Sequence, residues 1–84
     1  MLHKSVHTPH QKALQQLLKQ IRSDTGLNQR ELAQRLGVPQ SRVSDYERGE
    51  SLPDILVLRQ YLLAQGMTLA EFVARLEREI ESLG

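Results

Sequence analysis

The chain has 84 residues, of which 39% are hydrophobic and 25% charged, and its 11 Lys and Arg against 10 Asp and Glu give a net charge of +1. This length fits one small domain and excludes the large catalytic folds, and the absence of cysteine excludes disulfide scaffolds and cysteine-ligated metal sites. No apolar run approaches the roughly 20 residues that span a bilayer, so we expect a cytoplasmic protein with no membrane partner.

The residue types predict an all-α fold. Leu, Gln, Arg and Glu dominate and aromatic residues are scarce, a composition that favours helices over sheets. Gly, Pro and capping residues divide the chain into a flexible N-terminal tail at residues 1–8 and five helices joined by short connections. We therefore expect a single domain over residues 9–84.

The first predicted helix spans residues 9–24. Thr8 is suited to cap it, Pro9 suits its first position, and Gly26 supplies a stop after its end. The helix carries one stripe of apolar residues at the spacing of a buried face: Leu14, Leu17, Leu18 and Ile21.

The second and third predicted helices are short and joined by a tight turn. The second helix follows Asn28, which can cap it while Glu31 bonds back, and it ends before Gly37. The third helix spans residues 40–48. Apolar residues stand where the two helices must pack together: Leu32, Leu36, Val38, Val43 and Tyr46. Two helices with such a turn form a helix-turn-helix, which the sequence predicts over residues 29–48.

The fourth predicted helix begins near residue 53 and ends before Gly66. It is apolar on more than one face, so part of its surface must be covered. The fifth, over residues 68–82, opens with a capping box formed by Thr68 and Glu71. Its apolar residues recur at spacings of three and four.

The second half of the fifth helix is a candidate dimer seam. Three apolar residues would form it against a second copy: Leu76, Ile80 and Leu83. The alternative is that this half packs over the first helix of its own chain.

The third helix presents a short polar face. At about 100° per residue, Val43, Tyr46 and Glu47 share one side of this helix, and Ser and Asp side chains lie opposite. Short polar side chains let a helix enter the major groove of DNA, where Gln and Ser can bond base edges. Any solvated helix has a similar face, but solvation alone does not explain the companion helix and turn. No positioned nucleophile and base accompany these residues, so we expect no enzyme.

Residues 27–49 read LNQRELAQRLGVPQSRVSDYERG and resemble the XRE family, which includes Cro and CI-type phage repressors, controller proteins of restriction-modification systems and many antitoxins. The similarity extends over roughly residues 14–72. It implies a five-helix, lambda-repressor-like domain that binds double-stranded DNA. It further implies a transcription regulator, with repression favoured, that acts as a homodimer on a two-fold operator.

The resemblance also implies roles for individual residues. Base contacts would come from the third helix: Gln40, Ser41, Arg42, Ser44 and Asp45. Contacts with the DNA backbone would come from four residues around it: Asn28, Gln29, Arg48 and Ser51. Arg22 and Glu47 fall on family positions that pair across helices, and the helical face independently buries Glu47. We therefore predict a salt bridge between Arg22 and Glu47, the alternative being that Glu47 lies at the solvent rim.

Three residues depart from the family pattern. Glu50 stands where many relatives carry Lys or Arg, and Asp45 near the bases is unfavourable beside phosphate, although an acid can accept from cytosine. Pro39 replaces the usual small hydroxyl cap of the third helix. These departures concern affinity and base contacts and leave the predicted fold unchanged.

Charge is unevenly distributed along the chain. Residues 1–26 have a net charge of +3, residues 27–52 of zero and residues 53–84 of −2. The acidic C-terminal part and the apolar fourth helix support an alternative function, an antitoxin-type module that neutralises a toxin or another partner protein, with DNA binding secondary. The tail histidines His3 and His7, with His10, lack a nearby carboxylate, so we assign the chain no metal site and no cofactor.

Overall fold

The computed structural model describes residues 8–83, and in this range it contains five α-helices and no strand. The helices are α1 (Pro9–Asp24), α2 (Gln29–Leu36), α3 (Gln40–Arg48), α4 (Ile55–Leu63) and α5 (Leu69–Glu81). The all-α fold expected from the sequence is confirmed. The predicted tail, except for Thr8, lies outside the described residues. None of the helices in residues 8–83 combines the length and apolar character needed to cross a membrane.

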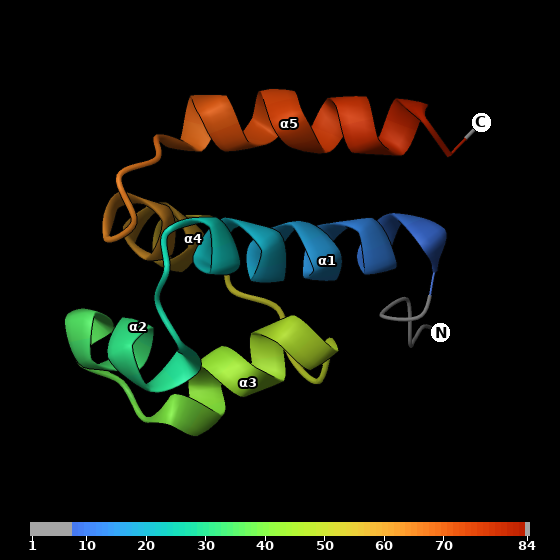
Figure 1. The fold of residues 1–84 in the computed structure, drawn as a ribbon. Coiled ribbons are helices and arrows are strands. Elements are labelled where there is room, and N and C mark those ends of the chain that lie inside the picture. The colour runs from blue at the N-terminus through green and yellow to red at the C-terminus, as the bar shows by residue number, and fades with distance from the viewer. Residues whose placement is uncertain (1–7, 84) are drawn as a thin grey trace.

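The helices pack around α1. Figure 1 shows α5 running antiparallel along one side of α1, with α2 and α3 on the opposite side. The helix α4 packs against α5, and α2 packs against α3. Because α1 contacts both α3 and α5, it separates the helix-turn-helix from the C-terminal helix.

The helices α1, α2 and α3 have the predicted bounds, and side-chain caps fix the starts of α1 and α2. The Thr8 hydroxyl accepts a hydrogen bond of 3.1 Å from the first turn of α1. At the start of α2, Asn28 Oδ1 accepts from the Glu31 N–H at 2.8 Å, and the Glu31 carboxylate accepts from the Asn28 N–H at 2.9 Å. This is the expected capping box. The start of α3 has no side-chain cap, since Pro39 occupies the N-cap position.

The ends of α4 and α5 differ from the predicted ranges by one or two residues. Asp54 accepts a hydrogen bond of 2.9 Å from the Val57 N–H, so α4 begins after this cap rather than near residue 53. At the start of α5, Thr68 and Glu71 form the second expected capping box. Hydrogen bonds from the Thr68 backbone and hydroxyl hold the pKa of Glu71 below its usual value.

All five helices contribute to one core. Its buried residues are Leu17, Leu18, Ile21, Leu32, Ala33, Val43, Tyr46, Tyr61, Leu62 and Phe72. The Tyr46 ring of α3 meets the Tyr61 ring of α4 edge-on, with 6.0 Å between ring centroids. Burial, followed by the charge of Glu47, raises the pKa of Tyr61 above its ordinary value. Val43 and Tyr46 thus hold one side of α3 in the core and leave its polar side outward.

The predicted dimer seam on α5 is partly covered by the chain itself. Leu76 packs against the core, and Ile80 is half-buried. Leu83 is 51% exposed. The packing of α5 over α1, which the sequence left open as an alternative, therefore accounts for Leu76 and leaves Leu83 as the exposed part of the seam.

Gly49, which ends α3, offers a stability test. Its φ is +76°, and a Cβ added there would lie 2.6 Å from Cδ of Gln15 on α1. We expect Gly49→Ala to lower the free energy of unfolding by more than the roughly 1–2 kcal/mol that a left-handed residue with a Cβ costs, because Gln15 must also move. Thermal unfolding measures the loss.

Gly26→Ala is the matched control for this test. Gly26 has the same φ of +76°, but a Cβ there would meet no atom within 4 Å. The difference between the two variants therefore isolates the contact with Gln15. Equal losses of thermal stability would show that this contact costs nothing.

Candidate nucleic-acid interface

The polar side of α3 faces outward. Gln40, Ser41 and Arg42 are exposed, and Ser44 and Asp45 are half-buried. The opposite side of α3 is buried through three residues, Val43, Tyr46 and Glu47. All five residues assigned to base contacts therefore lie on or beside the side of α3 that the core leaves free.

A buried ion pair fixes α3 to α1. Arg22 Nε lies 2.6 Å from Glu47 Oε2, and a second guanidinium nitrogen lies 3.0 Å from Glu47 Oε1. The remaining terminal nitrogen of Arg22 donates to the Leu27 carbonyl at 2.9 Å. The side chains of Arg22 and Glu47 are only 13% and 3% exposed. Hydrogen bonding to Glu47 raises the pKa of Arg22, so the guanidinium is charged throughout the physiological range.

The structure thus joins the two residues that the sequence paired, and it buries Glu47 instead of leaving it at the solvent rim. Two parallel N–H···O bonds of this kind set orientation as well as distance between the partners. The pair therefore determines how α3 sits on the bundle, and with it the direction in which the polar side of α3 points.

Gln29 extends this ion pair to the start of α3. Its Nε2 donates to Glu47 Oε1 at 3.0 Å, and its Oε1 accepts from Gln40 Nε2 at 3.4 Å. A continuous chain of contacts therefore runs from Arg22 through Glu47 and Gln29 to Gln40. Sequence reasoning placed Gln29 and Gln40 at different kinds of DNA contact and missed their pairing. The sequence did carry one signal for this pairing. Gln29 and Gln40 are the first residues of two helices that the motif packs together.

A hollow lies at the N-terminus of α2. It measures about 530 Å³ and is lined by Arg22, Asn28, Gln29, Arg30 and Gln40. The capping box uses the N–H groups of Asn28 and Glu31, so the first two N–H groups of the helix have no helical partner. These groups and the positive end of the helix dipole favour an anion.

Arg30 is a candidate contact that sequence reasoning missed. It is the second residue of α2, it lines this hollow and its side chain is exposed. Within residues 8–83 it forms no ion pair. The sequence signal for Arg30 was its position in the first turn of a capped helix. A cation there is not stabilised by the helix dipole, so its side chain is available to bind an external anion.

Two further predicted contact residues are paired with each other. Arg48 lies 2.9 Å from Asp45 Oδ1, with side chains 61% and 39% exposed. Exposed pairs of this kind contribute roughly 0–1 kcal/mol, so a phosphate can replace the carboxylate as the partner of Arg48. Ser51, exposed just beyond the end of α3, donates its backbone N–H to the Asp45 carbonyl at 3.4 Å.

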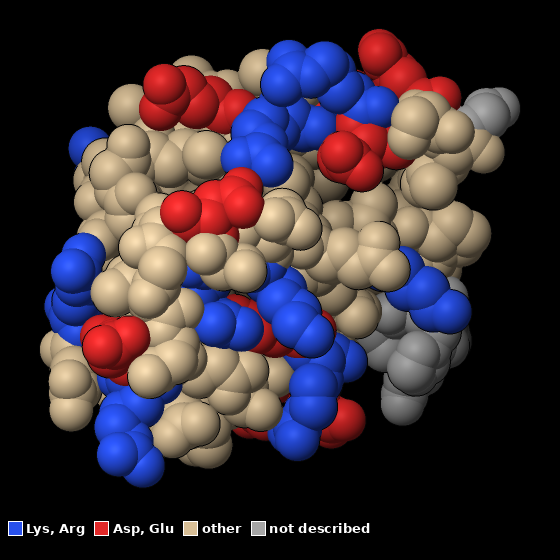
Figure 2. All heavy atoms as spheres, viewed as in Figure 1, with Lys and Arg blue, Asp and Glu red and all other residues tan. Residues whose placement is uncertain are grey.

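Charge differs between the two sides of the molecule. In Figure 2, Lys and Arg side chains outnumber carboxylates over α2 and α3, whereas carboxylates gather among the arginines along α5. The segment charges agree with this view, since α5 and the connection before it belong to the acidic part of the sequence. Residues 27–52, which carry α2 and α3, have a net charge of zero and residues 53–84 of −2, so the α3 side repels a polyanion less than the α5 side does.

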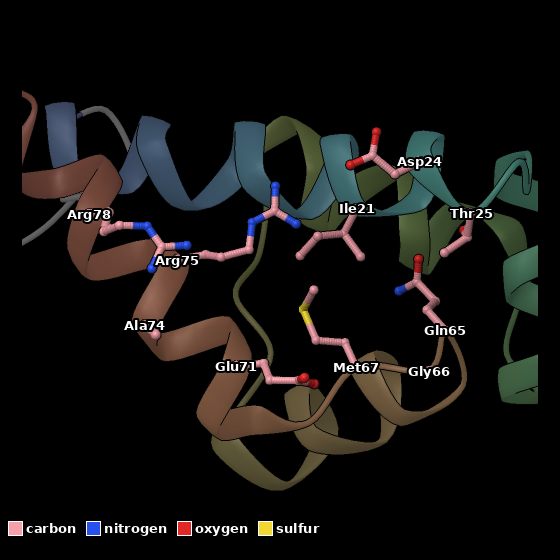
Figure 3. Close-up of a pocket in the computed structure, with 10 residues that line it drawn as sticks. All are labelled: Ile21, Asp24, Thr25, Gln65, Gly66, Met67, Glu71, Ala74, Arg75 and Arg78. Atoms are coloured by element: carbon pink, nitrogen blue, oxygen red, sulfur yellow. The ribbon is translucent and has the colours of Figure 1, made fainter.

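A second hollow, of about 430 Å³, lies on the other side of α1. Figure 3 shows Arg75 and Arg78 of α5 lining it together with Asp24 of α1 and Glu71 at the start of α5. Two cations and two carboxylates leave this hollow without a charge preference. It lies on the α5 side of α1, so it contributes no residue to the polar side of α3.

One family model matches the chain. The family is described as Helix-turn-helix, and the match covers residues 18–72, which is more than half of the chain. The matched range begins within α1 and includes the whole of α2, α3 and α4. No curated protein matches the sequence.

Proposed function

The chain belongs to the helix-turn-helix family, of the XRE type, and from this membership we propose that it represses transcription by binding a two-fold operator as a homodimer. The family consists of DNA-binding regulators rather than enzymes. The protein is accordingly a DNA-binding regulator. Family membership gives DNA binding and regulation, and we add repression, dimerisation and a two-fold operator as proposals.

The observation that carries the proposal is the chain of contacts from Arg22 to Gln40. Through Glu47 and Gln29 it holds the Gln40 amide at the tip of α3 while the Gln29 amide borders the hollow at the start of α2. An amide held at the tip of a helix can bond a base edge, and an anion hollow beside it can take a phosphate. One rigid unit would therefore engage a base and the adjacent backbone together.

In the proposed complex α3 lies in the major groove. Gln40, Ser41, Arg42, Ser44 and Asp45 face the bases. A phosphate occupies the hollow at the α2 N-terminus, held by Gln29, Arg30 and the free backbone N–H groups. Asn28, Arg48 and Ser51 approach neighbouring positions of the DNA backbone.

Dimerisation would give the operator its symmetry. Two copies related by a two-fold axis place their α3 helices in successive major grooves, about 34 Å apart. A dimer bound across a promoter in this way occludes RNA polymerase, which is the proposed mechanism of repression.

A second candidate function is the antitoxin-type module, in which the chain binds a partner protein. The observation that favours it is the exposure of large apolar side chains on α4, where Ile55 is 64% and Leu56 71% exposed. Exposed apolar surface of this kind marks protein interaction sites. The two functions differ in whether specific duplex binding is the main activity.

A salt titration tests the proposed function. Sites selected from a random DNA pool supply the duplex, and we expect log K to fall linearly with log salt as phosphate contacts release counterions. Arg30→Ala should reduce the magnitude of the slope by about one and weaken all sequences alike. Arg75→Ala, on the far side of α1, is the matched control and should leave the slope unchanged. Absence of specific duplex binding at low salt would reject the proposal in favour of the antitoxin-type module.

A further inference from the structure

The hollow between α1 and α5, which we call the α1–α5 hollow, is large enough for a small organic molecule. Its volume of about 430 Å³ falls within the roughly 300–1,000 Å³ that is usual for ligand sites. Residues from the end of α1, from the connection between α4 and α5 and from α5 itself line it. The residues assigned to DNA contacts lie elsewhere, so this hollow is free for another ligand.

We propose that the α1–α5 hollow binds a small amphoteric molecule, one that carries an ammonium group and a carboxylate separated by an apolar segment. The site is additional to the proposed DNA contacts, and the inference does not depend on them. It follows from the distribution of charge in the hollow, from its unused hydrogen-bonding groups and from its apolar side chains.

The two arginines of the hollow lack an anionic partner. Figure 3 shows Arg75 and Arg78 toward one end of the hollow and Asp24 toward the other. Within residues 8–83 neither arginine forms an ion pair or a side-chain hydrogen bond, although Arg75 is half-buried. A guanidinium can bind a carboxylate through two parallel hydrogen bonds. This end of the hollow therefore suits the carboxylate of a ligand.

The two carboxylates of the hollow have different local partners. Glu71 accepts from the N–H and the hydroxyl of Thr68, at 2.9 and 3.2 Å, and these bonds hold it at the start of α5. Asp24 accepts a single hydrogen bond, from Gln20 Nε2 at 2.7 Å. Asp24 is also the last residue of α1, where the negative end of the helix dipole disfavours a carboxylate and favours a cation. The end of the hollow at Asp24 therefore suits an ammonium group.

Gln65 supplies a hydrogen-bond acceptor that the described part of the chain does not use. The residue is only 9% exposed, and its Nε2 donates to the Tyr61 carbonyl at 3.0 Å. Its Oε1 has no hydrogen-bond partner within residues 8–83. Buried acceptors are rarely left unpaired, because burial removes their hydrogen bonds to water. Figure 3 shows this amide pointing toward α1 at the same end of the hollow as Asp24, so an ammonium group there could donate to both side chains.

Apolar side chains lie between the two ends of the hollow. Figure 3 places Ile21 and Met67 between the arginines and Asp24. Because Gln65 Oε1 is covered by its neighbours, a ligand reaches it by displacing a flexible lining side chain, and the long, unbranched Met67 is suited to this movement. An alkyl segment fits against these residues. An α-amino acid, whose opposite charges are adjacent, would not span them.

Three compounds of matched length test the site by NMR titration of the full chain without DNA. 6-Aminohexanoate carries both charges, hexanoate only the carboxylate and hexylamine only the ammonium group. We expect 6-aminohexanoate to bind at least about tenfold more tightly than the other two, because it alone makes charge-assisted contacts at both ends. The backbone signals of residues that line the hollow should shift and saturate. Equal dissociation constants for the three compounds, or shifts that do not saturate, would overturn the inference.

Substitutions at the two ends show which group of the ligand binds where. Arg75→Gln should weaken 6-aminohexanoate and hexanoate about tenfold and leave hexylamine unchanged, because only the carboxylate loses its partner. Asp24→Asn should weaken 6-aminohexanoate and hexylamine and leave hexanoate unchanged.

Arg59→Gln makes the same change as Arg75→Gln at an exposed arginine of α4 outside the hollow. It should alter none of the three dissociation constants, and circular dichroism checks that every variant is folded. Unchanged binding of 6-aminohexanoate in folded Arg75→Gln and Asp24→Asn, or an equal loss in Arg59→Gln, would reject the site. Because no measurement includes DNA, these outcomes leave the proposed function to its own test.

Discussion

Glu47→Gln is expected to lower the free energy of unfolding by about 3 kcal/mol, because it leaves the Arg22 guanidinium largely buried without its charged partner. The substitution keeps the shape of the side chain but removes its charge. Arg22 loses an anionic acceptor for two hydrogen bonds, and Gln29 loses the same acceptor at 3.0 Å. Small domains are stable by only about 5–15 kcal/mol, so this loss is readily measured by denaturant unfolding.

The exposed pair Asp45 and Arg48 provides the matched control for this prediction. Asp45→Asn removes one carboxylate from the same helix and breaks a single contact of 2.9 Å, but both side chains are well exposed to solvent. We expect a loss of no more than about 1 kcal/mol. Equal losses for Glu47→Gln and Asp45→Asn would contradict a special role for the buried pair.

A double replacement separates the charge from the packing. When both partners of a buried ion pair become apolar residues of similar volume, stability is often unchanged or increased. Arg22→Met combined with Glu47→Met should therefore be more stable than either single variant. It should also lose DNA affinity, since Gln29 then has no carboxylate to hold it beside Gln40. The free energy of unfolding would thus rise relative to the single variants, while the affinity for DNA would fall relative to the wild-type chain.

Local chemistry explains why much of the fold was predictable. The ends of α2 depend on Asn28, Glu31 and Gly37, which act within a few residues of each other, so sequence alone located them. The start of α4 was misplaced by two residues because two local rules compete there: Pro53 suits a first helical position and Asp54 suits an N-cap. The structure shows that the Asp54 cap prevails.

Contacts between distant side chains were less predictable. The helical face placed Glu47 inside, but the pairing of Gln29 with Gln40 depends on the conformations of two flexible amides eleven residues apart. Apolar periodicity has a related limit. It identifies a stripe that must be covered, as on α4 and α5, but not whether the cover comes from the same chain or from a second copy.

Gln40→Ala is expected to relax sequence specificity at one base pair. Loss of a bidentate amide contact costs about 1–3 kcal/mol at the preferred base, which corresponds to roughly a 5- to 150-fold loss of affinity. Operators altered at that base pair should lose little or nothing further, because the variant no longer distinguishes them. Competition binding against a set of operators, each changed at one base pair, measures the effect.

Gln29→Ala is the informative comparison, since its amide bonds to the same Gln40 side chain at 3.4 Å. If Gln29 serves the phosphate hollow and also holds Gln40, its truncation should weaken binding to all operators, and the Gln40 preference should be reduced but still detectable. The two variants therefore separate base reading from backbone binding within a single hydrogen-bonded pair. An equal loss on every operator from Gln40→Ala would contradict its assignment to a base. A loss confined to one base pair from Gln29→Ala would show that Gln29 acts only by holding Gln40 in place and binds no phosphate.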